Sequence, residues 1–121
     1  MNDVEETISF YEKCFGFSRK FITHEKDYGE LITGETVLAF ASFELGNANF
    51  KKGFTKITNS KPPLGMEIVL VSDNIDEDFQ KAISAGATEY ESISEKSWGQ
   101  KVGYLIDKNG ILIEMCTPID N

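Results

Sequence analysis

Apolar residues in the first part of the chain recur at the spacing of an amphipathic helix. Asp3 followed by Glu6 matches a capping box at the start of this segment, and Gly16 is a typical helix end. The pattern therefore predicts a helix within residues 3–17 that buries one face. The residues of that face are Val4, Ile8, Tyr11 and Phe15.

A second amphipathic segment spans residues 72–87. Acidic residues crowd its first turn, where they interact favourably with the positive end of a helix, and Gly86 marks its end. We expect a second helix here with an apolar stripe on one side. That stripe consists of Ile75, Phe79, Ala82 and Ile83.

Three strand-like segments follow each helix. A turn glycine, Gly34 or Gly110, joins the last two segments of each half. The chain therefore consists of two similar copies of one helix plus three strands. Aligning the last strands, TVLAFAS and GILIEMCT, places Phe40 opposite Glu114. The six strand-like segments are residues 18–25, 28–34, 35–44, 87–94, 100–110 and 111–119.

The two halves differ at their beginnings. The β-branched run GMEIVLVSD, residues 65–73, precedes the second helix and predicts a buried strand. Only Met1 and Asn2 precede the first helix, so the matching strand of the first half is missing from this sequence. Two explanations stay open here: a chain shortened at its N-terminus, or a first half that does without this strand.

Residues 46–65 form a long connection between the halves. Their sequence has little regular pattern, which predicts a loop, and long loops in compact domains often cover functional sites. Phe50 and Phe54 give this loop an apolar side. We favour packing of both rings on a nearby sheet edge over a role as a lid.

The motifs of the chain resemble those of the vicinal oxygen chelate superfamily, which includes glyoxalase I, bleomycin-resistance proteins, fosfomycin-resistance enzymes and extradiol dioxygenases. The resemblance covers essentially the whole chain. It is carried by residues 3–17, by YGELITG and by WGQKVGYLIDKNGILIEMCTP, where Asp107, Gly110 and Glu114 form a distinctive ending.

The resemblance implies an α+β fold of paired βαβββ modules within one domain, residues 1–121. Module 1 would span about residues 1–45, the linker loop 46–65 and module 2 about residues 66–121. Many members are homodimers, so a homodimer that binds a small molecule is the expected assembly.

In metal-dependent members of the superfamily, each module holds the ion with one residue on its first strand and one on its last. The resemblance thus implies Glu67 and Glu114 as ligands of one divalent metal ion, with Glu114 also as a catalytic base. Phe40, at the matching position of the first module, cannot bind a metal. The chain departs from the metalloenzyme pattern at this point.

Two carboxylates that meet on neighbouring strands would repel each other in a place of low dielectric constant. A metal ion, a shared proton, or hydrogen bonds from Trp98, Gln100 or Tyr104 could each relieve the repulsion. Phe40, Trp98 and Tyr104 are also candidate ligand-binding residues, because their rings could stack on a flat molecule. Ordinary core packing is the alternative, especially for Phe40 and Tyr104.

Composition narrows the function classes. The net charge of −8 and the lack of a basic stripe argue against nucleic acid as a partner. No apolar run is long enough to cross a membrane, and the acidic N-terminus does not look like a secretory signal. Cys14 and Cys116 lack metal or redox spacing, which predicts buried thiols and a cytoplasmic protein. His24, the only histidine, is expected to be a solvated residue near a strand end.

Two functions therefore remain as hypotheses. The first is a metal-assisted lyase or isomerase of the glyoxalase I type that uses Glu67 and Glu114. The second is a metal-free module, similar to bleomycin-resistance proteins, that binds or sequesters a small aromatic or cationic molecule.

Overall fold

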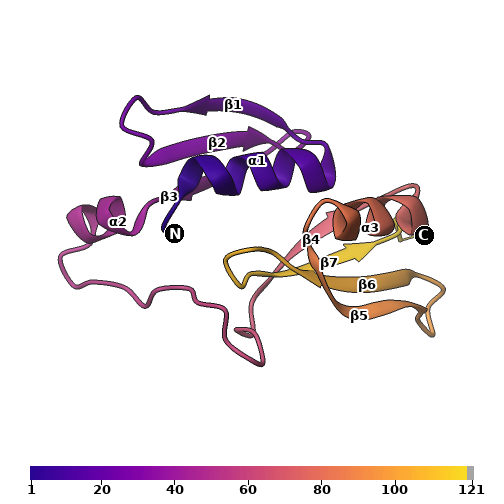
Figure 1. The fold of residues 1–121 in the computed structure, drawn as a ribbon. Coiled ribbons are helices and arrows are strands. Elements are labelled where there is room, and N and C mark those ends of the chain that lie inside the picture. Colours follow the sequence, from indigo (N-terminus) through magenta and orange to yellow (C-terminus); the bar gives the residue numbers. More distant parts are fainter. Residues whose placement is uncertain (120–121) are drawn as a thin grey trace. The chain divides into compact units, whose positions relative to one another are not determined.

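The computed structural model describes residues 1–119 and divides the chain into two compact units. Unit 1 comprises Met1–Ile57, and unit 2 begins at Thr58 (Figure 1). Unit 1 contains one sheet and two helices, and the described part of unit 2 contains one sheet and one helix.

Unit 1 contains an antiparallel sheet of three strands in the order β1-β2-β3. Helix α1 packs on this sheet (Figure 1). A second, short helix follows the last strand. The elements are α1 (Val4–Phe15), β1 (Ser18–Ile22), β2 (Tyr28–Ile32), β3 (Val37–Ala41) and α2 (Phe43–Asn49).

Helix α1 begins and ends as its sequence predicts. The Asp3 side chain accepts a hydrogen bond from the backbone N–H of Glu6 at 2.9 Å, which caps the first turn. Gly16 ends the helix in the left-handed conformation, with φ of 71°. Ile8 and Tyr11 are fully buried, whereas Phe15 is only half-buried.

Unit 2 has the complete βαβββ arrangement that the sequence predicts for the second half. Its sheet has the order β4-β7-β6-β5, in which β4 runs parallel to β7 and the other neighbours are antiparallel. The elements are β4 (Glu67–Val71), α3 (Ile75–Ser84), β5 (Thr88–Glu95), β6 (Lys101–Ile106) and β7 (Leu112–Cys116).

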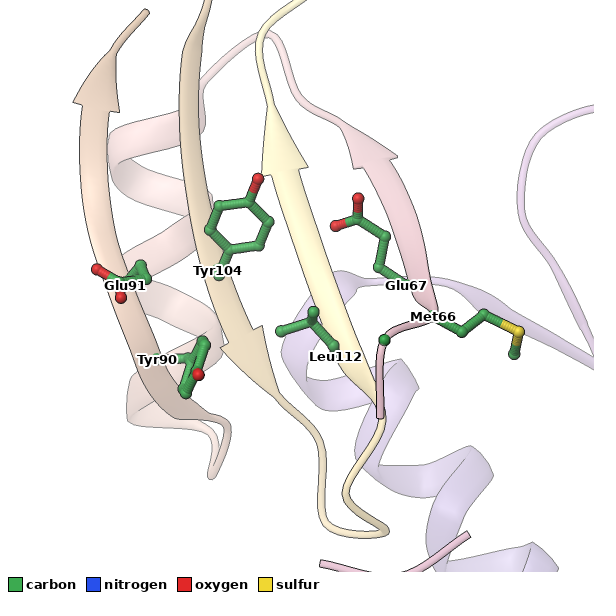
Figure 2. A pocket seen from close by; sticks show the side chains of 7 residues that line it. Met66, Glu67, Tyr90, Glu91, Tyr104 and Leu112 are labelled. Carbon is green, nitrogen blue, oxygen red and sulfur yellow. The ribbon is translucent and has the colours of Figure 1, made fainter. Parts of the chain in front are cut away.

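Helix α3 covers one face of the unit 2 sheet (Figure 2). A Cβ added at Gly103 would lie 2.7 Å from the ring of Phe79, so α3 approaches β6 closely at this glycine. Leu105 and Ile113 are fully buried on this side. We call the opposite side of the sheet the α3-distal face. Because side chains alternate along a strand, the register assigns to this face Glu67, Val69, Tyr104, Leu112 and Glu114.

Met1 pairs with the outer edge of β3. The Met1 amino group donates to the Ala41 carbonyl at 2.9 Å, and the Phe43 N–H donates to the Met1 carbonyl at 3.0 Å. In unit 2, the Ser72 N–H makes the equivalent bond to the Cys116 carbonyl at 2.8 Å. Met1 thus takes the position that follows β4 in unit 2, and the described part of unit 1 lacks a counterpart of β4.

The segment predicted as a linker loop, residues 46–65, is partly helical, which corrects the sequence prediction. Helix α2 reaches Asn49, and the Ser42 hydroxyl caps it by accepting from the Leu45 N–H at 3.1 Å. Phe50 and Phe54 pack on each other, with ring centroids 6.0 Å apart, and the ring centroid of Phe54 also lies 6.2 Å from that of Phe43. A cap followed by a single helical turn or two is too short for apolar periodicity to reveal.

Candidate functional site

The two glutamates of interest lie on neighbouring strands of unit 2. Strand β4 pairs with β7 so that Glu67 faces Leu112 and Val69 faces Glu114. Alternation then directs both Glu67 and Glu114 to the α3-distal face. Glu114 is half-buried there, whereas Glu67 is more exposed.

Tyr104 completes this group from strand β6. It lies directly opposite Glu114 in the antiparallel register, and its hydroxyl donates a hydrogen bond to Glu114 Oε1 at 3.2 Å. Burial, and then the negative charge of Glu114, raises the pKa of Tyr104. Tyr104 therefore remains a neutral phenol and serves Glu114 as a hydrogen-bond donor.

The surroundings of Glu67 and Cys116 disfavour negative charge on these two side chains. Partial burial, followed by repulsion from Glu114, raises the pKa of Glu67. Cys116 lies on the same strand as Glu114, and burial together with that carboxylate raises the pKa of its thiol. Within residues 1–119, neither Glu67 nor Glu114 forms an ion pair.

A hollow of about 320 Å³ opens beside this group, entirely within unit 2 (Figure 2). Figure 2 shows Glu67, Tyr104 and Leu112 rising from neighbouring strands on the side away from α3. Glu114 lies next to the hollow through its hydrogen bond with Tyr104. The lining residues are Gly65, Met66, Glu67, Tyr90, Glu91, Tyr104 and Leu112.

Five of the seven lining residues are not among the site residues that the sequence predicts: Gly65, Met66, Tyr90, Glu91 and Leu112. Glu91 pairs with Tyr104 across the β5–β6 ladder, which brings its carboxylate to the same face. Register shifts on either side of Glu91 interrupt the alternation of β5 and hide this placement from the sequence. The position of Leu112 on the same face as Glu114 can be predicted, because the two residues are two positions apart on one strand.

Trp98 lies elsewhere in unit 2. Its indole N–H donates to Gln100 Oε1 at 2.8 Å, so the ring is held in place although it is 64% exposed. Trp98 lines a separate hollow of about 290 Å³ together with Asp73, Gly99, Gln100, Thr117, Pro118 and Ile119. Glu67, which lines the first hollow, begins β4, and Asp73, which lines the second, follows the end of this strand. A strand rises by about 3.3 Å per residue, so these two residues lie roughly 20 Å apart.

The register corrects the predicted alignment of the two halves. Gly29 pairs with Phe40 in unit 1, as Gly103 pairs with Met115 in unit 2. The counterpart of Glu114 is therefore Ala39, one position before Phe40. Phe40 is only 4% exposed and its ring centroid lies 5.0 Å from that of Tyr11, so its side chain belongs to the core under α1.

The donor set does not amount to a complete metal site. Glu67 and Glu114 offer two oxygen ligands, but the described residues contain no group of three or more His, Cys, Asp or Glu side chains that could hold an ion. Ala39, at the position matching Glu114, has no donor. His24 is exposed in the turn between β1 and β2. Catalytic divalent sites usually hold about three protein ligands, so the residues present do not fit one.

Unit 1 contains a similar tyrosine–carboxylate pair at the place that corresponds to Tyr104. Glu30 pairs with Ala39, and its carboxylate accepts a hydrogen bond from the Tyr28 hydroxyl at 2.6 Å. Lys20 Nζ lies 3.7 Å from the same carboxylate. Unlike Glu114, Glu30 thus has a cationic neighbour, so its charge is compensated.

None of the helices within residues 1–119 has the length and apolar character that crossing a membrane requires.

A comparison with models of protein families identifies one family. The model of the glyoxalase/bleomycin resistance protein/dioxygenase superfamily matches residues 1–115. No curated protein matches the chain.

Solved structures share the fold at low sequence identity. A glyoxalase-related enzyme from Fulvimarina pelagi has a TM-score of 0.80 and 17% identity, covering 98% of this chain and 82% of that one. A glyoxalase/bleomycin resistance protein/dioxygenase family enzyme from Burkholderia phytofirmans has a TM-score of 0.75 and 19% identity, with 97% and 91% covered. A superfamily member from Sphaerobacter thermophilus has a TM-score of 0.73 and 18% identity, with 98% and 90% covered.

Proposed function

Because the chain belongs to the glyoxalase/bleomycin resistance protein/dioxygenase superfamily, we propose that it binds a small organic molecule on the α3-distal face of unit 2. The observation that carries this proposal is the hollow beside Glu67 and Tyr104. Its volume of about 320 Å³ falls in the range typical of small-molecule sites. Its lining combines apolar side chains with a few polar groups, as such sites do.

Each polar group has a distinct role in this proposal. Tyr104 presents one side of its ring to the hollow, while its hydrogen bond to Glu114 holds the ring in one orientation. Glu67 supplies a carboxylate at the other end of the lining. Binding then needs no metal, because the ligand itself would contact these groups.

A thermal-shift screen in the presence of EDTA tests this proposal. Small aromatic, cationic and neutral compounds are screened, and each hit is repeated on Tyr104→Phe and Glu67→Gln. We expect a hit whose stabilisation falls in both variants. Tyr28→Phe is the matched control, since it also removes a tyrosine–glutamate hydrogen bond, but in unit 1. Hits that respond equally to Tyr28→Phe and Tyr104→Phe would exclude the hollow as the site.

A second candidate function is a metal-assisted lyase or isomerase in which Glu67 and Glu114 are two of the metal ligands and Glu114 is also the base. The observation that favours it is the raised pKa of Glu67, which partial burial and then repulsion from Glu114 cause. A divalent cation would relieve that repulsion. Such a site needs further ligands, and the described residues form no group of three or more His, Cys, Asp or Glu side chains that could hold an ion.

Metal titrations distinguish the two functions. Mg²⁺, Mn²⁺, Ni²⁺ and Zn²⁺ are added to the EDTA-treated protein, and the melting temperature is measured. A metal enzyme requires a rise that Glu114→Gln abolishes and Glu30→Gln leaves intact. No shift with any of the four ions would retire the metal-assisted reaction.

We also propose that the protein is a homodimer, as its superfamily suggests. Light scattering coupled to size-exclusion chromatography gives the mass directly. A mass of about twice the 13.6 kDa of one chain supports the dimer, and a mass near 13.6 kDa contradicts it.

A further inference from the structure

The hollow in unit 2 contains negative charge that no cationic side chain compensates. Glu67 and Glu91 line it, and Glu114 adjoins it through Tyr104. No lysine or arginine is among the lining residues. Within residues 1–119, none of these three carboxylates takes part in an ion pair.

The rest of the lining is aromatic and apolar. Tyr90, 44% exposed, and the half-buried Tyr104 contribute rings from neighbouring strands β5 and β6. Met66 and Leu112 contribute apolar surface, and Leu112 lies between Glu91 and Glu67 (Figure 2). Aromatic faces attract cations, and apolar side chains favour alkyl groups over a hydrated ion.

These observations together restrict the ligand. An anion would be repelled by the carboxylates, and a neutral ligand would leave them uncompensated. A hydrated metal ion would gain nothing from Tyr90, Met66 and Leu112. We propose that the hollow selects an organic cation whose charged atom is bonded to alkyl groups, such as a substituted ammonium. This inference rests on the function proposed above. Glu67 and Glu91 would compensate the charge of the cation, while Tyr90 and Tyr104 would contact its alkyl surface.

Choline and its uncharged carbon isostere, 3,3-dimethylbutan-1-ol, test this proposal. The two probes have nearly the same shape and differ in charge. Titrations are followed by two-dimensional amide NMR at constant ionic strength, so that both affinity and location are measured. We expect choline to bind at least about tenfold more tightly than the isostere, with shifts at the lining residues.

Variants of strand β5 provide the matched control. Glu91→Gln removes a lining carboxylate at an exposed position and should weaken choline binding several-fold while leaving the isostere unchanged. Glu95→Gln removes an exposed carboxylate from the same strand outside the hollow and should change neither.

The outcomes separate this inference from the function on which it rests. Equal affinity of the two probes at the lining residues would overturn selection for cations and leave small-molecule binding in place. Selection for cations would also be overturned if Glu91→Gln left the shifts with choline unchanged, or if choline caused no shifts at all. The EDTA screen then decides independently whether the hollow binds other molecules.

Discussion

Gly103 offers a direct test of how α3 holds the sheet that carries Tyr104. A Cβ at this position would lie 2.7 Å from Cε1 of Phe79 and 2.9 Å from Cγ1 of Ile93. Phe79 is only 4% exposed, so its ring has little room to move. Overpacking of this kind costs about 1–3 kcal/mol. The lower entropy of an unfolded chain with alanine offsets about 0.4–1 kcal/mol of that cost.

Gly103→Ala should therefore lower the free energy of unfolding by about 1–2 kcal/mol, which corresponds to a fall in Tm of roughly 3–10 °C for a chain of this length. Thermal melts followed by circular dichroism measure this. Gly65→Ala is the control, because no atom lies within 4 Å of its added Cβ and its φ is not positive. If the two variants have the same Tm, α3 does not approach β6 as closely as the distances at Gly103 indicate.

Four further predictions follow from particular side chains. Asp3→Ala removes the cap of α1 and should cost about 1 kcal/mol in urea unfolding. Phe40→Ala should cost about 3–5 kcal/mol, whereas Trp98→Ala should change stability little, because one ring is buried and the other is exposed. The pKa of Glu67 is raised in the folded state, so its ionisation destabilises the fold. Glu67→Gln should therefore raise the free energy of unfolding at pH 7 by up to about 1 kcal/mol, as for a charge pair near the surface, and thermal melts should show a higher Tm. This gain should shrink as the pH falls through the raised pKa toward the ordinary value. Burial raises the pKa of Cys116, so a thiol reagent at pH 7 should label this thiol far faster in unfolded than in folded protein.

The helices could be predicted because their signals are local. Asp3 and Gly16 bound α1 through hydrogen bonds and a backbone conformation that depend on a few neighbouring residues. The signal in the ending formed by Asp107, Gly110 and Glu114 also comes partly from local interactions. The Asp107 carboxylate accepts hydrogen bonds from the backbone N–H groups of Asn109 and Ile111, at 2.8 and 2.9 Å, and so shapes the turn before β7.

The register of the strands was less accessible. The turn between β2 and β3 comprises residues 33–36, whereas the turn between β6 and β7 comprises residues 107–111 and is one residue longer. Aligning the halves by their sequences therefore slips by one position, which moves every side chain to the other face. This slip placed Phe40 opposite Glu114, although Phe40 lies in the core under α1 and Ala39 is the true counterpart.

The candidate site was predicted in part. Alternation along β4 and β7 was enough to suggest that Glu67 and Glu114 share a face, since both strands are regular. The contributions of Tyr90 and Glu91 depend on the irregular pairing of β5, and the placement of Trp98 in a separate hollow depends on the hairpin between β5 and β6. Such features arise from tertiary packing, which the spacing of residues in the sequence does not encode directly.

The most direct test of small-molecule binding on the α3-distal face is to map where a ligand binds in the absence of metal ions. A hit from the EDTA screen is titrated into isotope-labelled protein, and amide NMR shifts are followed residue by residue. If the ligand binds in the hollow on the α3-distal face, the shifts should be concentrated at the lining residues Glu67, Tyr104 and Leu112. Shifts confined to Trp98 and Thr117, or to unit 1, would contradict binding in this hollow.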